Sequence, residues 1–253
     1  MSRRKRASRS PTQTARPPLS PPPKRWWTAP LGLVLITIGA YSRVWQYGYI
    51  WDDKFYVTQN TALRDLHGLW RIWSDVTATL QYYPLVHTSF WLEFHLWGLN
   101  PIGYHLVNVA LHALAAVLLW RVLFLLGVPG AWLGAAIFGL HPVEVESVAW
   151  ISERKNVLSA VFYFAAAWSY LRFARIAEKR EEQKSRRFFY ILALLLFISA
   201  LLSKTVTCSL PAALLLVIWW KKGRLGRQEV MPALPFFIIG LPFGLLTAWL
   251  EKH

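Results

Sequence analysis

Two adjacent acids, Asp52 and Asp53, lie in the aromatic stretch "YIWDDKFYVTQN", and either could serve as a general base. Three cations follow in two later segments: Arg154 and Lys155 in "WISERKNVLS", and Lys204 in "LLSKTVTCSLP". Lys and Arg side chains bind phosphate through charge-assisted hydrogen bonds. A carboxylate that faces a bound phosphate group could accept a proton from an incoming hydroxyl. This chemistry requires the five residues to meet at one place in the fold.

Further polar residues could support such a site. Tyr104, Asn108 and His112 recur every four residues along an apolar segment, with His105 beside them. Interhelical hydrogen bonds are the simpler explanation of this stripe. Two of its histidines would lie about 10.5 Å apart along a helix, too far to bind one ion directly, so no metal site is predicted. The other candidates for a supporting role are Tyr83, His141, Glu144, Glu146 and Ser203.

The elements that would position these residues are apolar. Of the 253 residues, 55% are hydrophobic and 15 are Trp. Crossing a hydrocarbon core of about 30 Å takes roughly 20 helical residues, and several apolar runs approach this length. We therefore predict an all-α integral membrane protein, a polytopic bundle of about seven spans. The predicted spans are 26–45, 102–126, 131–141, 156–173, 188–202, 205–220 and 231–250.

The net charge of +15 is distributed in a way that predicts orientation. Residues 1–25 carry eight cations and no acid, and further cations cluster at 172–187 and 221–227. Lys and Arg remain on the cytoplasmic side of membranes, so these three segments are expected to share that side. We predict a disordered, basic cytoplasmic tail over 1–25, a membrane domain over 26–253, and no nucleic-acid partner.

The candidate site residues then fall on the opposite, outer side. The predicted outer loop 46–100 should contain surface helices, one with Leu63, Leu66, Trp70 and Trp73 on a single face. A second is expected over "PLVHTSFWLEFHLWG", after which "NPIG" caps the second span.

Simpler explanations exist for the charged outer residues. Glu144 could only cap a helix, because acids in a first turn complement the helix dipole. Arg154 could form a structural ion pair with a glutamate. The short arms of the hairpin that carries Lys204 place this residue below the membrane surface, from which its side chain could extend to the headgroups.

The quoted motifs, together with "YYPLVHTSFWLEFHLWGLNPIGYHLVN" and "LHPVEVESVAWISERKNVLS", follow one another in a familiar order. Over about residues 30–222 the chain resembles the transmembrane and tetratricopeptide-repeat O-mannosyltransferase family, within the GT-C class of glycosyltransferases. The "HPVEVESVAWISERK" block carries most of this resemblance. Tyr83 departs from it, since many members have Arg before this proline, and the sequence contains no tetratricopeptide repeat.

The resemblance implies an enzyme that moves a mannose-like sugar from a polyprenyl-phosphate or dolichyl-phosphate donor to Ser or Thr hydroxyls of a protein acceptor. It implies catalytic Asp52 and Asp53, a donor phosphate bound by Arg154, Lys155 and Lys204, and a GT-C-like membrane domain that is incomplete here. The basic, Pro-rich tail favours a bacterial inner membrane over the endoplasmic reticulum. A divalent metal is neither required nor excluded.

Two other classes of protein are compatible with the sequence. A non-catalytic, truncated membrane module would bind a lipid phosphate or a partner protein without turnover. A transporter would use the polar stripe as a path, but no inverted repeat supports this alternative.

Overall fold

The computed structural model describes residues 27–175 and 183–250, and every regular element among them is helical. The predicted tail 1–25 lies outside the described residues. The α-helices are α1 (Thr28–Ala40), α2 (Leu66–Ser74), α3 (Pro84–Trp97), α4 (Pro101–Leu125), α5 (Ala131–Leu140), α6 (Glu144–Ala149), α7 (Arg154–Phe173), α8 (Gln183–Leu201), α9 (Leu210–Lys222), α10 (Arg227–Val230) and α11 (Leu234–Leu250).

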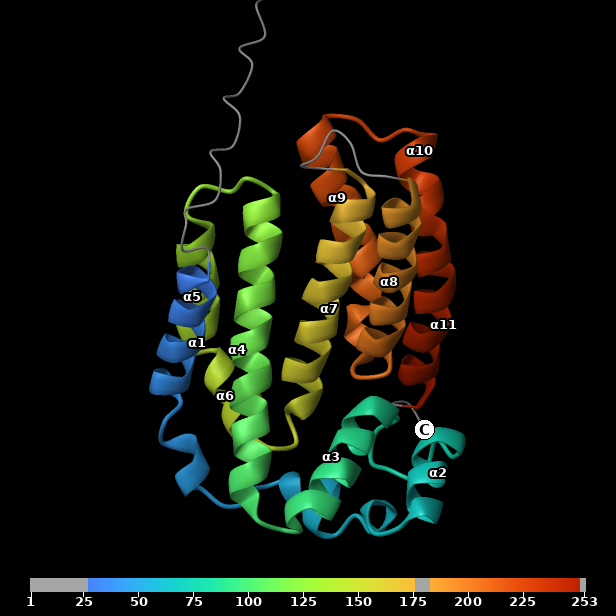
Figure 1. The fold of residues 1–253 in the computed structure, drawn as a ribbon. Coiled ribbons are helices and arrows are strands. Elements are labelled where there is room, and N and C mark those ends of the chain that lie inside the picture. The colour runs from blue at the N-terminus through green and yellow to red at the C-terminus, as the bar shows by residue number, and fades with distance from the viewer. Residues whose placement is uncertain (1–26, 176–182, 251–253) are drawn as a thin grey trace, which may run out of the picture.

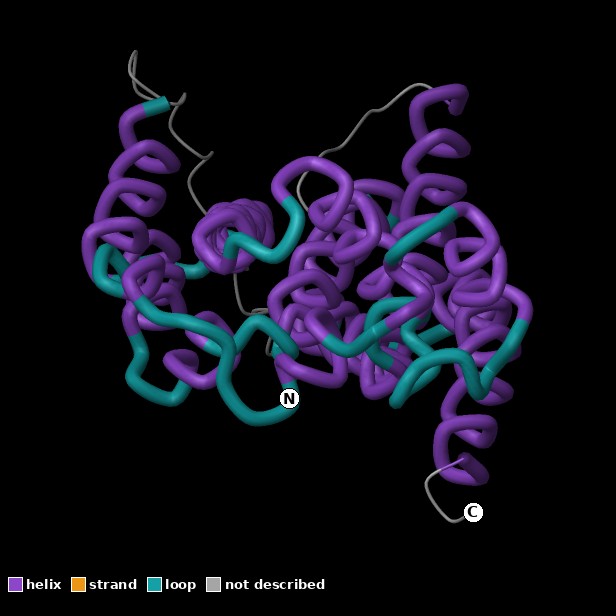
Figure 2. Tube along the Cα trace, turned by 90° about the horizontal axis from the view of Figure 1, so that it is seen from below, coloured by secondary structure: helices purple, strands orange, loops and turns teal. Residues whose placement is uncertain are grey.

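Seven of these helices form an upright bundle. Helices α1, α4, α5, α7, α8, α9 and α11 run along one axis, and α2 and α3 lie across one end of it (Figure 1). Each of the seven apolar runs predicted from the sequence overlaps one bundle helix, so the prediction that these runs are helical is confirmed. Seen from the α2–α3 end, long loops cross the near face (Figure 2).

Fewer helices than predicted have the length of a membrane span. By length and composition, two ranges among the described residues qualify: Pro101–Leu125 and Arg227–Thr247. The second range combines α10, a short 3₁₀ turn and most of α11. Helix α5, with 10 residues, is shorter than the roughly 20 residues that a full crossing takes.

Local sequence explains where the bundle helices begin and end. The Asn100 side chain accepts a hydrogen bond from the Ile102 N–H at 3.1 Å, and Pro101 opens α4, as "NPIG" predicts. The turn between α4 and α5 uses Gly127 and Gly130 at φ of 62° and 74°, a region that glycine enters without strain. Helix α5 stops directly before His141–Pro142, because the residue before proline avoids the helical conformation.

The two largest of the four hydrophobic clusters among the described residues connect most of the bundle and its α2–α3 end. The larger lies between α7, α8, α9 and α11, with buried Tyr170, Phe197, Leu214 and Phe236. The second joins the α2–α3 end to the bundle and is strongly aromatic; it contains buried Tyr56, Leu63, Tyr83, Phe90, Tyr104 and Ile151. The second cluster fixes the loop segment that follows Asp52 and Asp53.

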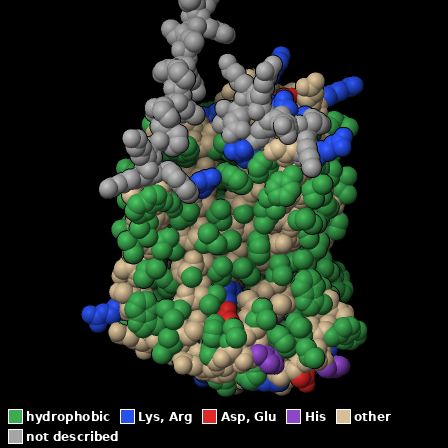
Figure 3. Space-filling view, viewed as in Figure 1, with side chains coloured by type: hydrophobic (Ala, Val, Ile, Leu, Met, Phe, Trp, Pro, Cys, Tyr) green, Lys and Arg blue, Asp and Glu red, His purple; other side chains and the backbone are tan. Residues whose placement is uncertain are grey.

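The outer surface of the bundle is apolar over a broad belt. In Figure 3 hydrophobic side chains cover the middle of the molecule, and Lys and Arg gather near the top, where Figure 1 places α9 and α10. Large apolar side chains are exposed on several bundle helices: Leu35, Ile38, Leu106, Leu133, Ile137, Ile191, Leu195, Leu216, Ile238, Leu241 and Leu245. Soluble proteins rarely expose apolar surface continuously in this way.

One predicted surface helix needs correction. Leu63 does not share the face of Leu66, Trp70 and Trp73, because it lies in a separate 3₁₀ turn and is buried. The chain is extended at Asp65, whose carboxylate accepts the Gly68 N–H at 2.6 Å and starts a new helix there. The other three side chains are exposed on α2, and the second expected helix is present as α3.

Gly68→Ala tests this arrangement. A Cβ at Gly68 would lie 2.2 Å from the Ala62 carbonyl oxygen, so the turn and α2 must separate. Such overpacking typically destabilises a protein by about 1–3 kcal/mol. We expect faster proteolytic cleavage within 58–75 in the detergent-solubilised protein. Gly39→Ala is the matched control, since a Cβ at Gly39 meets nothing within 4 Å. Equal cleavage of both variants would contradict the packing described.

Candidate active site

A cavity of ≈ 530 Å³ opens at the end of the bundle that carries α2 and α3. We call it the Asp52 cavity. Its polar wall contains Asp52, Tyr56, Gln81, Lys155 and Thr205, and Tyr83 also lines it. Opposite, α11 contributes Phe243, Leu246 and Thr247. Ligand pockets commonly measure about 300–1,000 Å³ and combine an apolar lining with a few polar groups, as this one does.

The two adjacent acids are in different environments. Asp53 is fully buried, and its two carboxylate oxygens accept backbone N–H groups of Ser152 at 2.7 Å and Ile50 at 3.1 Å. Asp52 is exposed and lines the cavity. Among residues 27–175 and 183–250, its carboxylate makes no hydrogen bond or ion pair. Asp53 therefore anchors the loop to the start of α7, and Asp52 is available to a ligand.

The backbone before Asp52 is strained. Trp51 has φ of 45°, in the left-handed region that bulky side chains avoid at a cost of roughly 1–2 kcal/mol. Its indole stacks on Trp150, with ring centroids 5.8 Å apart, and remains 76% exposed. The turn at Trp51 lets the Asp53 carboxylate enter the interior while Asp52 faces the cavity.

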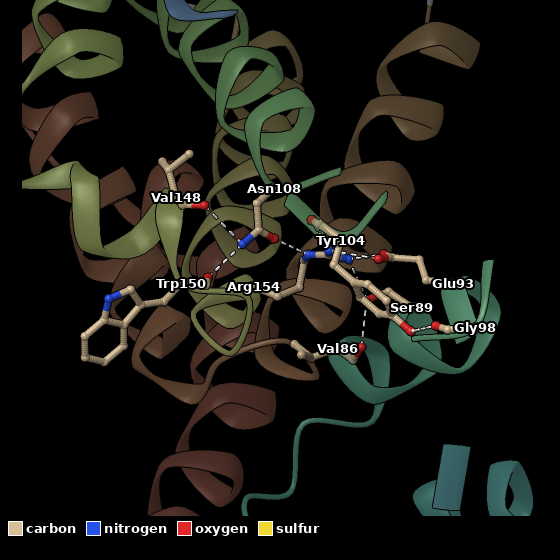
Figure 4. A network of polar contacts seen from close by, with 9 residues as sticks. All are labelled: Val86, Ser89, Glu93, Gly98, Tyr104, Asn108, Val148, Trp150 and Arg154. Atoms are coloured by element: carbon tan, nitrogen blue, oxygen red, sulfur yellow. Dashed lines mark hydrogen bonds and ion pairs between the residues drawn. The ribbon is translucent and has the colours of Figure 1, made fainter. Parts of the chain in front are cut away.

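Arg154 lies at the centre of a polar network between α3, α4 and α7 (Figure 4). It is fully buried and forms an ion pair with Glu93 of α3, through both guanidinium NH₂ groups. It also donates to the Asn108 side-chain oxygen, to the Tyr104 carbonyl at 3.0 Å and to the Ser89 hydroxyl at 3.2 Å. The structural ion pair is thus present, with Glu93 as the partner of Arg154.

The neighbouring lysine faces the cavity instead. Lys155 Nζ lies 2.9 Å from a Glu153 oxygen, 3.4 Å from the Tyr56 hydroxyl and 5.1 Å from the centre of the Tyr56 ring. The other Glu153 oxygen accepts the Asn156 amide at 2.6 Å, and Asn156 accepts a hydrogen bond from Lys204. These contacts connect the two lysines through Glu153 and Asn156.

Lys204 faces a second cavity of ≈ 420 Å³ on the other side of this chain of contacts. We call it the Lys204 cavity. Its lining includes Glu144, Asn156, Ser159, Tyr163 and Thr207. Burial lowers the pKa of Lys204, Glu153 opposes that shift, and Lys155 adds to it. A half-buried ammonium group with a depressed pKa favours an anionic ligand beside it.

Tyr56 is supported from behind by a neutral histidine. The imidazole of His87 stacks on the Tyr56 ring, with centroids 5.3 Å apart, and burial lowers the pKa of His87 to about 4. The Tyr56 hydroxyl donates to the Gln81 side-chain oxygen at 2.6 Å. Burial also raises the pKa of Tyr56, so the phenol stays protonated. Tyr56 and Gln81 form a neutral polar wall beside Lys155.

The polar stripe on α4 serves helix packing. Asn108 donates to the Trp150 carbonyl at 2.8 Å and to that of Val148 at 3.3 Å, and His112 Nε2 lies 3.1 Å from the Gly139 carbonyl. The interhelical explanation therefore holds for both. His105 is buried and interacts electrostatically with Asp53.

The remaining candidates lie apart from the Asp52 cavity. The His141 ring accepts the Val143 N–H at 3.2 Å, a local contact in the turn between α5 and α6. Glu146 is exposed on α6. Ser203 is buried and donates to the Ser199 carbonyl at 2.8 Å, a local helix contact. Among the described residues no group of three His, Cys, Asp or Glu side chains could hold a metal ion.

Some residues of the site were not predicted from the sequence. Glu153 directly precedes the two cations in "SERK", and Glu93 is the one acid in the apolar sequence of α3. An isolated carboxylate among apolar residues signals a buried partner. Tyr56 and Asn156 carried no comparable signal, because only folding places them beside Lys155.

The fold and site define an all-helical protein with a polar cavity at one end of an apolar bundle. Part of the chain is similar to protein O-mannosyl-transferases named TMTC. Tmtc1 of Drosophila melanogaster is 35% identical over 136 residues, 49% of this chain. Human TMTC4 is 30% identical over 188 residues, 64% of this chain. The resemblance inferred from the motifs is therefore confirmed.

The similarity covers only a small part of the length of these relatives. The matched region spans 16% of the fly protein, 25% of human TMTC4 and 15% of mouse TMTC3, which is 31% identical over 135 residues. No protein-family model matches this sequence. No solved structure matches it either.

The buried ion pair predicts a particular pattern of stabilities. Arg154→Met leaves Glu93 buried without its cation, and removal of one partner of a buried pair costs about 3–5 kcal/mol. Lys155→Met removes a cation whose side chain lines the open Asp52 cavity and is 13% exposed, so we expect a smaller loss than for the fully buried Arg154. The combination of Arg154→Met with Glu93→Leu should be more stable than Arg154→Met alone. Thermal unfolding in detergent tests this order, and equal losses for Arg154→Met and Lys155→Met would contradict it.

Proposed function

We propose that this chain is the membrane portion of a GT-C-like glycosyltransferase, with the bundle embedded in a bilayer. The exposed apolar belt supports this, since lipid tails are the surroundings that such a surface needs. All seven bundle helices then cross or enter the membrane, with the α2–α3 end on the outer or luminal side. The basic α9–α10 end and the tail are cytoplasmic, and the tail favours a bacterial inner membrane.

The proposed reaction moves a mannose-like sugar from a polyprenyl-phosphate or dolichyl-phosphate carrier to a Ser or Thr hydroxyl of a protein. The printed names of the relatives describe protein O-mannosyl transfer. The observation that carries the proposal is the Asp52 cavity, where a carboxylate without a partner among the described residues, a lysine and an apolar helix face one space. A lipid-linked phosphosugar needs these three environments together.

Asp52 is the proposed general base. It accepts the proton of the acceptor hydroxyl as that oxygen attacks the anomeric carbon, and the bond from this carbon to the phosphate oxygen breaks. Phosphate is already a good leaving group, so no second carboxylic acid is required, in contrast to glycoside hydrolysis. A single displacement of this kind inverts the anomeric configuration.

Lys155 and Lys204 are the proposed partners of the phosphate charge. Ammonium groups that are already in place stabilise negative charge as it develops. Lys155 lines the Asp52 cavity. Lys204 is connected to Lys155 by a chain of contacts through Asn156 and Glu153. Arg154 was also predicted to bind the phosphate; since Glu93, Asn108, Ser89 and Tyr104 surround its guanidinium, we now assign it to holding Lys155 in position.

The residues that remain from the predicted site take indirect roles in this proposal. Asp53 fixes the loop that carries Asp52, and Tyr83 shapes the cavity wall. On the apolar side, Phe243 and Leu246 would contact the polyprenyl chain. A non-catalytic module that binds the donor lipid without turnover is the second candidate, since the same cavity with its lysine and apolar wall would hold the lipid without a reaction.

Asp52→Asn should reduce kcat for sugar transfer by about 10²–10⁴-fold, the usual contribution of a general base. Its thermal unfolding should not change, because the carboxylate is exposed and unpaired among the described residues.

Asp53→Asn should lower the unfolding temperature, since it weakens two buried hydrogen bonds. Transfer from a polyprenyl-phosphomannose donor to a Ser/Thr peptide is measured in reconstituted membranes. Donor binding without turnover in the unchanged chain would support the non-catalytic alternative.

The pH dependence of donor KM tests the role of Lys204. Burial lowers its pKa, so its charge is lost at a lower pH than that of a free lysine, whose pKa is about 10.4. Donor KM should rise as pH increases through this lowered pKa. Lys204→Arg keeps its charge over the whole range and should abolish the rise. Identical profiles for both proteins would argue against Lys204 as a phosphate partner.

A further inference from the structure

The Lys204 cavity is separate from the space proposed for sugar transfer. Its lining comes from α4, α5, α6, the first half of α7 and the 3₁₀ turn Thr205–Ser209. Figure 1 places α6 and the start of α7 in the half of the bundle nearer to α2 and α3. Neither Asp52 nor Lys155 lines this cavity. A ligand in it would therefore be distinct from the one proposed for the Asp52 cavity.

Two opposite charges face the Lys204 cavity without pairing to each other. Among the described residues, the Glu144 carboxylate accepts no hydrogen bond and forms no ion pair. The Lys204 ammonium group donates to the Asn156 side-chain oxygen and forms no ion pair with the same residues. A partly buried charge without a counter-charge is costly. A ligand that carries one anion and one cation would satisfy both groups.

The pKa values of the two groups point in the same direction. Burial raises the pKa of Glu144, and His141 opposes this shift. Burial lowers the pKa of Lys204, as described above. Both shifts disfavour the charged form, so opposite charges supplied by a ligand would stabilise each group.

The hydroxyl groups of the cavity are able to accept further hydrogen bonds. Ser159, Thr207 and Ser209 each donate to a backbone carbonyl three residues earlier, at 3.1, 2.7 and 3.1 Å. Their protons are thereby used, and their oxygen lone pairs remain for a donor. Together with Glu144, these oxygens favour a ligand with several N–H donors, such as a primary ammonium group.

The apolar side of the cavity continues into the exposed belt. Phe138 and Phe164 line it, and Val206, which also lines it, is 64% exposed. Beside Phe138 on α5, Ile137 is 55% exposed. A ligand with long apolar chains would keep its headgroup in the cavity and lay these chains against the belt. This arrangement favours a lipid over a small water-soluble zwitterion.

We propose that the Lys204 cavity binds the headgroup of phosphatidylethanolamine from the outer leaflet. The lipid phosphate would accept from Lys204, and its ammonium group would donate to Glu144 and to the hydroxyl oxygens. The proposal rests on the membrane embedding put forward above, but not on Asp52 or on sugar transfer. Lys204 has three N–H donors and Asn156 uses one, so its charge still acts on a sugar-donor phosphate beyond Asn156.

The experiment uses the full chain, purified in detergent and stripped of lipid. Native mass spectrometry measures the binding of phosphatidylethanolamine, phosphatidylglycerol and phosphatidylcholine with the same acyl chains. We expect the unchanged chain to retain phosphatidylethanolamine about tenfold more strongly than the other two, since only its headgroup has N–H donors for Glu144. Absence of this preference would overturn the proposal.

Glu144→Gln should abolish the preference, because a neutral amide no longer attracts an ammonium group. Glu144→Asp keeps the charge and should keep most of the preference. The matched control is Glu146→Gln, which removes the same charge from an exposed residue of α6 that does not line the cavity. This control should bind like the unchanged chain. An equal loss in Glu144→Gln and Glu146→Gln would mean unspecific attraction and overturn the proposal, as would an unchanged preference in Glu144→Gln.

Lys204→Gln tests the phosphate half of the proposed site. The three lipids share a phosphate, so this variant should weaken the binding of all three by a similar factor. The preference for phosphatidylethanolamine should remain, because Glu144 is unchanged. Undiminished binding of all three lipids would contradict the assignment of the phosphate to Lys204.

Two further measurements distinguish the source of the headgroup and the two proposals. If soluble phosphoethanolamine at millimolar concentration displaces the lipid completely, the cavity binds the free headgroup and the lipid assignment is wrong. Asp52→Asn should bind phosphatidylethanolamine like the unchanged chain, and weaker binding would place the lipid in the Asp52 cavity instead. Loss of sugar transfer with intact lipid preference would leave this proposal standing, and loss of the preference with intact transfer would refute it alone.

Discussion

The cost of burying a guanidinium constrains the whole site end of this protein. Arg154 is fully buried, and a buried charge is tolerated only when it is paired and hydrogen-bonded. Glu93 supplies the counter-charge from α3, and Asn108 and the Tyr104 carbonyl supply acceptors from α4. The first residue of α7 is thereby fixed against two other helices, and this sets the position of the residues that follow it.

The two pairs of adjacent charged residues, Asp52–Asp53 and Arg154–Lys155, are arranged in the same way. In each pair one residue is buried as an anchor and its neighbour faces the Asp52 cavity: Asp53 and Arg154 are anchors, and Asp52 and Lys155 line the cavity. Neighbouring side chains in a turn or helix point in different directions, so one member can hold the backbone while the other meets a ligand. An anchored backbone limits the movement of the exposed partner, which is what a preorganised site requires.

The two ends of the bundle differ in the chemistry of their side chains. At the α2–α3 end, acids and cations are combined with neutral polar groups, and Glu153 balances the lysines. At the α9–α10 end, residues 221–229 include four cations and one acid. Between them lies the apolar belt, interrupted inside the bundle by polar residues that hydrogen-bond between helices. The membrane embedding proposed above would account for this division.

The sequence by itself determined the helical class, the position of each bundle helix and several boundaries. Long apolar runs, Asn100–Pro101 and the break at Pro142 act through local geometry, so these predictions need no tertiary contact. The charge pattern also predicts that the basic segments share one side of a membrane, and this stays a prediction. Where a boundary depended on a competing cap, as at Asp65, the hydrophobic period alone was misleading and Leu63 was assigned to the wrong element.

Only the tertiary structure decided which of the charged residues can reach a ligand. Asp52 and Asp53 are equivalent in the sequence, and Arg154 is a better phosphate ligand than Lys155 by residue type. Their burial depends on residues distant in the chain: Ser152 binds Asp53 across 99 positions, and Glu93 binds Arg154 across 61. Such pairings arise when helices pack, and neither composition nor periodicity encodes which neighbour will turn inward.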